Sequence, residues 1–240
     1  MTDARHSAAR APLKPVDAAT VIIVKQDAGG PRILIGQRHP RHRFMPGKFV
    51  FPGGRVDPED RRMAPAVEMA PATLDRLLLQ MRGRASPARA QGIAMAAIRE
   101  TYEETGLVIG RPAGSDYADG AWSESWRNFR AEGYAPDPSC LTYFARAITP
   151  PDRVRRFDSR FFVVAAQAIA NLDRPAKISN EELLTPRWVT FGEAYGLDLP
   201  SITRDILQRL EQLWTPSGLP AAFPLPFRYL KGKTWRCDYL

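Results

Sequence analysis

The sequence contains few cysteines, and the two that are present, Cys140 and Cys237, lie far apart in the chain. Two isolated cysteines provide neither a disulfide framework nor the paired ligands of a structural zinc site. This scarcity fits a reducing compartment, so we expect a cytoplasmic protein, with one bridge between the two cysteines as the alternative. The sequence also lacks an apolar run long enough to span a bilayer, so we expect no membrane association.

The N-terminal residues lack the apolar core of a secretory signal, although they include Arg5, His6 and Arg10. Few acidic residues are present there, as in a transit peptide. A flexible arm over residues 1–15 is the simpler interpretation.

Acidic residues are outnumbered, because the chain has 34 lysines and arginines against 26 aspartates and glutamates, a formal net charge of +8. Such an excess favours anionic partners. The basic residues form no long tail and no nucleic-acid-binding motif, so we expect a small anionic ligand and no binding of nucleic acid.

Short apolar segments alternate with amphipathic segments of helical periodicity, which is typical of an α/β domain. Strands are predicted at 18–25, 32–37, 48–51, 107–109, 140–148, 159–166 and 187–191. Helices are predicted at 72–81, at 87–105, within 116–130 and at 201–213. Residues 216–240 are rich in proline and show no periodic pattern, so we expect a tail that wraps over the body or mediates association.

The predicted helix at 87–105 carries the most informative residues of the chain. Glu100, Glu103 and Glu104 are spaced as i, i+3 and i+4, which places the three carboxylates on one helix face. Their repulsion costs helix stability, and a divalent cation would offset this cost. Oxygen-rich sites suit Mg²⁺ or Mn²⁺. The alternative is an acidic face that is only solvated.

A second informative segment precedes this helix. The predicted strand at 48–51 leads into Pro52, Gly53 and Gly54, where the chain must bend and where its backbone can closely approach a phosphate group.

The two segments together resemble the Nudix hydrolase family. The box of this family begins with a glycine and an early glutamate, and it ends in Arg-Glu, an apolar residue, any residue, Glu-Glu, any residue, Gly and an apolar residue. Gly54 matches the first glycine, and residues 99–107 match the second half, with Thr101 at the first apolar position. The resemblance implies an α/β/α sandwich with a mixed, curved sheet over residues 16–215. It also implies metal-dependent hydrolysis of a pyrophosphate bond.

This sequence departs from the box in two ways. A long insert, residues 56–85, separates its two halves. Four apolar residues of the insert recur at helical spacing and need a partner, so we expect a lid or a dimer contact, with packing on the same domain as the alternative; they are Leu74, Leu77, Leu78 and Met81. The early glutamate is also absent: its position is held by Asp60 when counted from Gly54, and by Gln91 when counted from Arg99.

A further resemblance concerns the substrate. Arg38, Arg43, Gly47 and the run Phe51-Pro52-Gly53-Gly54 have the spacing of the coenzyme A diphosphatase branch, with Gly36 and His39 as departures. This implies coenzyme A or acyl-coenzyme A as the substrate, with both arginines contacting its extra phosphate. Solvated surface arginines are the alternative. Open alternatives for the function are a nucleotide-sugar, ADP-ribose or dinucleotide pyrophosphatase, and a non-catalytic Nudix-fold binding module.

The Nudix resemblance also implies roles for individual residues. Glu100, Glu103 and Glu104 would hold Mg²⁺ or Mn²⁺, and Arg99 would pair with a neighbouring carboxylate. Gly53 and Gly54 would bring the backbone close to the phosphates. The sequence leaves the identity of the general base open between four candidates, which are Glu103, Glu104, Glu181 and Glu182. The sequence also leaves open whether the chain forms a homodimer.

Overall fold

The computed structural model describes residues 13–114, 122–177 and 182–240. Most of the predicted flexible arm, with Arg5, His6 and Arg10, lies outside the described residues, as do Glu181 and part of the predicted helix within 116–130.

A mixed sheet of nine strands forms the centre of the described part of the chain. Its strands are β1 (Val16–Asp27), β2 (Gly30–Arg38), β3 (Phe49–Val50), β4 (Gly53–Arg55), β7 (Thr142–Ile148), β8 (Phe157–Ala165), β9 (Leu183–Thr190), β10 (Pro226–Lys231) and β11 (Thr234–Tyr239). The strand order is β11-β10-β7-β8-β1-β2-β3, with β4 paired to β1 and β9 paired to β2. Two further strands, β5 (Gly110–Pro112) and β6 (Tyr134–Pro136), form a separate small sheet.

Strand β1 lies at the middle of the sheet. It runs parallel to β8 from Val16 to Val24 and pairs antiparallel with β2 and β4 on its other side. Its residues from Val21 to Val24 are fully buried. Both faces of the strand are therefore covered, which explains why its sequence is a nearly continuous apolar run rather than an alternating one.

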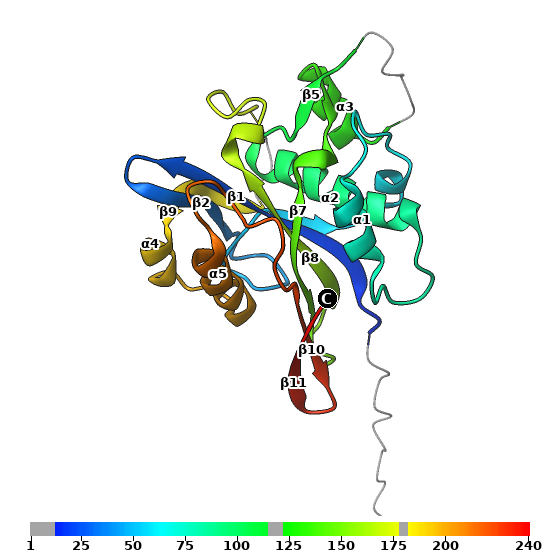
Figure 1. The fold of residues 1–240 in the computed structure, drawn as a ribbon, viewed down its shortest axis with the longest axis vertical. Helices are drawn as coiled ribbons and strands as arrows, with labels where there is room; N and C mark the ends of the chain where they lie inside the picture. Colours follow the sequence, from blue (N-terminus) through cyan, green and yellow to red (C-terminus); the bar gives the residue numbers. More distant parts are fainter. Residues whose placement is uncertain (1–12, 115–121, 178–181) are drawn as a thin grey trace, which may run out of the picture.

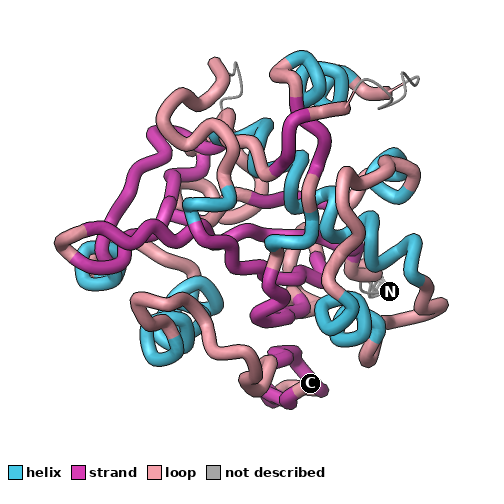
Figure 2. The backbone as a smooth tube through the Cα atoms, turned by 45° about the horizontal axis from the view of Figure 1, so that its top comes forward, coloured by secondary structure: helices cyan, strands magenta, loops and turns pink. Residues whose placement is uncertain are grey.

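Helices cover both faces of the sheet (Figures 1 and 2). The helices are α1 (Pro71–Leu78), α2 (Pro87–Thr105), α3 (Glu124–Ala131), α4 (Phe191–Tyr195) and α5 (Ser201–Leu213). Val21 and Ile23 of β1 pack in the core that contains α2, whereas Ile22 and Val24 pack in the core that contains α5. The predicted α/β/α sandwich with a mixed sheet is confirmed.

Helix α2 has the bounds that the sequence predicts. The side chain of Ser86 accepts a hydrogen bond of 3.3 Å from the backbone N–H of Arg89, and Pro87 occupies the first helical position. Gly106 ends the helix with a φ of 71°, a backbone conformation that glycine adopts without strain. These signals fix where Glu100 and its neighbours lie along the helix.

Two sequence predictions are wrong. Residues 107–109 form no strand but a buried connection to β5, in which the backbone N–H of Val108 donates to the side chain of Asn171, 2.8 Å away. The tail, predicted to lack periodic structure, contains the hairpin β10–β11, and β10 extends the sheet by pairing parallel with β7. The missed signal is Gly232, which has a φ of 63° at the start of a two-residue turn.

The insert packs on the same domain. Leu77 and Met81 are buried, and Leu74 and Leu78 pack partly against the core formed by α2 and the sheet. The apolar face of the insert is thus covered by its own chain, so this face gives no reason to expect a partner subunit.

No described helix combines the length and the apolar character needed to cross a membrane. Both cysteines are free: Cys140 is half-buried and Cys237 is exposed.

Candidate functional site

The structure brings the glycine turn and the carboxylate helix together. Glu100 and Glu104 of α2 are buried, with exposed fractions of 8% and 3%. The backbone N–H of Gly53 donates a hydrogen bond of 2.8 Å to Oε2 of Glu104. A side chain at Gly54 would overlap the carboxyl group of Glu100. The absence of a side chain at Gly54 therefore allows β4 to lie directly against these carboxylates.

Arg99 lies at the centre of the site. Its Nε and Nη2 donate to the two carboxylate oxygens of Asp60, at 2.9 and 3.0 Å, and Nη2 also donates to the backbone carbonyl of Arg55, at 2.9 Å. Its Nη1 donates to Glu100 and Glu103, at 2.9 and 3.0 Å. One guanidinium group thus holds two of the predicted metal ligands and fixes them to the insert.

Asp60 and Gln91, the two candidates for the position of the early glutamate, have different surroundings. Asp60 is fully buried and also accepts a hydrogen bond from the indole N–H of Trp126, 3.1 Å away. The side chain of Gln91 donates instead to the backbone carbonyl of Met63, at 2.7 Å. Asp60 is therefore the residue that contacts Arg99. Sequence reasoning missed the role of Trp126, which no local pattern indicates.

The electrostatics of the site favour a bound cation. Burial raises the pKa of the Glu100 carboxyl to about 7, and Arg99 opposes this shift while the charge of Glu103 adds to it. Burial and the neighbouring charge of Glu100 raise the pKa of Glu104 well above its ordinary value. Burial alone would lower the pKa of Arg99. Its hydrogen bonds to Asp60 and the charges of the surrounding carboxylates have a larger effect in the opposite direction, so the pKa is raised and Arg99 stays charged. The described residues therefore do not fully compensate the charges of these two buried carboxylates.

The donor set fits a hard divalent cation. Among the described residues, no group of three or more histidine, cysteine, aspartate or glutamate side chains has the geometry of a complete metal centre. This agrees with the observed bonds, in which Glu100 and Glu103 turn to Arg99 and Glu104 turns to Gly53. Mg²⁺ commonly binds through one or two carboxylates together with water and substrate phosphates, so the three glutamates suit it without forming a closed cage.

The predicted arginines lie at the end of β2 and on the loop between β2 and β3. The side chain of Gln37 donates to the carbonyl of Gly47, at 2.9 Å, and closes this loop. Nη1 of Arg38 lies 2.9 Å from Nδ1 of His42, and the positive charge of Arg38 offsets part of the rise that burial causes in the pKa of Glu104. Arg43 is exposed on the same loop. Arg38 therefore lies within electrostatic range of the Glu104 carboxylate, whereas Arg43 faces solvent.

Glu182, which directly precedes β9, borders the site. Its backbone carbonyl accepts a hydrogen bond of 3.1 Å from the N–H of His39, and its charge raises the pKa of Glu100 and Glu104. Its side chain is 60% exposed, with Oε2 3.9 Å from Nε2 of His42. Glu182 is thus the most exposed of the general-base candidates that the structure describes.

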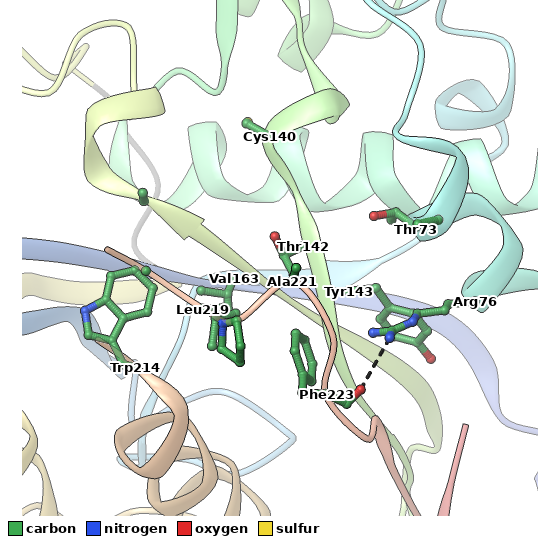
Figure 3. Close-up of a pocket in the computed structure, with 14 residues that line it drawn as sticks. Thr73, Arg76, Cys140, Thr142, Tyr143, Val163, Trp214, Leu219, Ala221 and Phe223 are labelled. Carbon is green, nitrogen blue, oxygen red and sulfur yellow. Dashed lines mark hydrogen bonds between the residues drawn. The ribbon is translucent and has the colours of Figure 1, made fainter. Parts of the chain in front are cut away.

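A cavity of about 370 Å³ lies elsewhere, between α1, β7, β8 and the segment that follows α5. Figure 3 shows Thr73, Arg76, Tyr143 and Trp214 around it. None of the residues that line it belongs to the site predicted from sequence. The carboxylate site is thus separate from this cavity.

Comparisons with known proteins bear on the fold. No family model matches the sequence. The structure resembles a Nudix hydrolase from Alicyclobacillus acidocaldarius, with a TM-score of 0.57 and 23% sequence identity over 81% of this chain and 90% of that chain. It also resembles the Nudix domain of Shewanella oneidensis NrtR, solved with ADP-ribose, with a TM-score of 0.47 and 11% identity over 90% and 100% of the two chains. The first likeness shows that this chain has the fold of that hydrolase.

Proposed function

We propose that this protein is a metal-dependent hydrolase of the Nudix type, which cleaves the pyrophosphate bond of a nucleoside diphosphate derivative. The contact between Gly53–Gly54 and the buried carboxylates of Glu100 and Glu104 carries this proposal. It combines backbone that can approach phosphates with acidic side chains that a cation would stabilise.

Each residue of the site has a task in this reaction. Glu100, Glu103 and Glu104 would hold Mg²⁺ or Mn²⁺. When bound, such an ion neutralises phosphate charge and lowers the pKa of a water molecule. Arg99 positions Glu100 and Glu103 and is itself held by Asp60. Because Arg99 is only 4% exposed, its role is to position these carboxylates rather than to contact the substrate.

The general base is a choice between candidates with different surroundings. Glu104 is buried and bonded to Gly53, and Glu103 is bonded to Arg99. Glu182 is exposed beside both buried carboxylates, so we favour Glu182 as the residue that accepts a proton from water. A Glu182→Gln variant should then lose the acidic limb of the pH profile of kcat, which a structural role would not remove.

We further propose coenzyme A or an acyl-coenzyme A as the substrate. Cleavage within its diphosphate gives an adenosine bisphosphate and a phosphopantetheine product. Arg38 lies at the end of β2 within electrostatic range of Glu104, and exposed Arg43 on the following loop would reach a phosphate outside the reacting diphosphate. Guanidinium groups suit this task because they bind phosphate through two hydrogen bonds.

A product-resolved substrate screen tests the proposal. Coenzyme A, an acyl-coenzyme A, dephospho-coenzyme A, ADP-ribose, a nucleotide sugar and a dinucleotide are each incubated with Mg²⁺ or Mn²⁺, with a Glu104→Gln variant as control. We expect the fastest cleavage for coenzyme A or its thioester. Preference for ADP-ribose, a nucleotide sugar or a dinucleotide would overturn the substrate assignment only. Tight binding of one ligand without cleavage would indicate a non-catalytic binding module.

A further inference from the structure

The last strand of the sheet offers an open edge. Among the described residues, β11 pairs with β10 alone, and the sheet ends there. Every residue of β11 is exposed, and Trp235 and Tyr239 expose 47% and 64% of their surface. In Figure 1 the β10–β11 hairpin projects from the lower end of the molecule. A long exposed edge of this kind is a template for a further strand.

The observed hydrogen bonds show which backbone groups face the open side. Leu240 and Leu225 bond to each other in both directions, at 2.9 and 3.4 Å. Bonded and non-bonded pairs alternate along antiparallel strands. Asp238 and Arg236 therefore also bond to β10. The alternate residues turn their backbone N–H and C=O groups to the open edge, and these residues are Trp235, Cys237 and Tyr239.

The hairpin is held firmly in this position. Arg228 of β10 forms an ion pair with Asp205 of α5, and its guanidinium group lies 5.0 Å from the ring centroid of Trp235. Phe227 is buried against the guanidinium group of Arg146, at 4.2 Å from the centroid. The edge is thus preorganised, so little ordering cost opposes the addition of a strand.

We propose that β11 pairs with β11 of a second copy of this chain, antiparallel and centred on Cys237, so that two copies form a symmetric dimer through their sheet edges. In this register Cys237 lies opposite Cys237 of the second copy. Arg236 lies opposite Asp238 of the second copy, and Asp238 opposite its Arg236. Trp235 lies opposite Tyr239. Opposite charges and aromatic pairs directly across two strands stabilise a sheet.

The same edge disfavours other registers. When the two-fold axis is perpendicular to the sheet, two opposite residues must point to the same face of the sheet. The sum of their residue numbers can therefore change only in steps of two, and the two neighbouring registers differ by one such step. One such shift places Arg236 opposite Arg236, and the other places Asp238 opposite Asp238. Like charges directly opposite each other are destabilising. The charge pattern of β11 is therefore complementary to itself in one register, which favours a second copy over an unrelated chain.

Charge reversal provides a selective test. Arg236→Asp gives a strand with two acidic residues, and Asp238→Arg gives a strand with two basic residues. Each variant alone sets like charges opposite each other, whereas a mixture restores both opposite-charge pairs. In sedimentation velocity over a range of concentrations, we expect the wild type to show a monomer–dimer equilibrium. Each variant alone should sediment as a monomer, and their equimolar mixture should form a dimer.

A proline variant separates edge pairing from folding. The N–H of Cys237 points away from β10, so Cys237→Pro should keep the hairpin but remove the two central hydrogen bonds of the dimer. We expect a monomer with the circular dichroism spectrum and melting temperature of the wild type. A wild type that stays monomeric at every concentration would overturn the proposal. So would a dimer that persists in this variant and in both charge variants, since it would then use another surface.

If a charge variant fails to fold, crosslinking of the unaltered edge tests the proposed register instead. Cys140→Ala leaves Cys237 as the only thiol. Two Cys237 thiols brought together lose two electrons and two protons to diamide, which becomes the hydrazine, and an S–S bond forms. We expect rapid formation of a covalent dimer, and its absence would refute the register centred on Cys237.

Discussion

Arg99 and Asp60 form a buried ion pair through two parallel hydrogen bonds, of 2.9 and 3.0 Å, across the junction between α2 and the insert. Asp60 has no exposed surface, and Arg99 exposes 4% of its own. The same guanidinium group holds Glu100 and Glu103. The insert therefore completes the proposed site instead of interrupting it.

Loss of Asp60 should affect both stability and turnover. Asp60→Ala leaves a buried guanidinium group with too few acceptors, and breaking such a pair costs roughly 3–5 kcal/mol. Urea denaturation should show this loss, and kcat should fall more than KM changes because Glu100 and Glu103 lose their anchor. Asp60→Glu should recover part of kcat. Gln91→Ala is the control, because it removes one hydrogen bond worth about 1 kcal/mol. Equal effects at both positions would contradict the assignment of Asp60.

Removal of a proposed metal-binding carboxylate should sharply reduce turnover while the fold survives. Glu103→Gln and Glu104→Gln keep the side-chain volume but remove a charge that the metal ion needs. We expect kcat to fall by about 10²–10⁴-fold, since metal-ion catalysis contributes several kcal/mol of charge stabilisation. Steady-state kinetics and circular dichroism measure the two effects separately. Near-normal turnover in both variants would show that these residues hold no catalytic ion.

The raised pKa of Glu100 predicts how stability depends on pH. Its ordinary pKa is 4.5 and its folded value is about 7. Protonated Glu100 therefore favours the folded state, and this stabilisation is complete below pH 4.5 and is lost as the pH rises to about 7. In chelator, Glu100→Gln should exceed the wild type in unfolding free energy at pH 8 by roughly 1–3 kcal/mol, and this advantage should shrink towards pH 4.5. Urea titrations across this range test it, and a constant difference would contradict it.

Much of this site could be predicted from sequence because the relevant signals are local. Ser86 and Gly106 fix the ends of α2, so the spacing of Glu100, Glu103 and Glu104 determines their shared face. The contact of Asp60 with Arg99 could not be derived, because two counts gave different candidates and the hydrogen bonds that identify Asp60 join residues far apart in the sequence. The β10–β11 hairpin was missed because its residues alternate weakly and only Gly232 indicates the turn.

The arginine loop predicts a selective loss of activity. If Arg38 and Arg43 contact the 3′-phosphate of coenzyme A, their replacement by alanine should reduce kcat/KM for coenzyme A about 10-fold or more. The effect on dephospho-coenzyme A, which lacks this phosphate, should be small. Arg41→Ala is the matched control, because Arg41 is an exposed arginine on the same loop. Equal losses on both substrates would mean that the arginines serve the diphosphate generally.

Hydrolysis in ¹⁸O-enriched water tests the central claim most directly. The wild type is incubated with Mg²⁺ and coenzyme A or another cleaved pyrophosphate, and both products are identified by mass spectrometry beside a Glu104→Gln control. Our account predicts two phosphomonoester products, one ¹⁸O atom in one of them, and only trace product with Glu104→Gln. Release of inorganic phosphate from a monoester, or no cleavage of any pyrophosphate with Mg²⁺ or Mn²⁺, would contradict it.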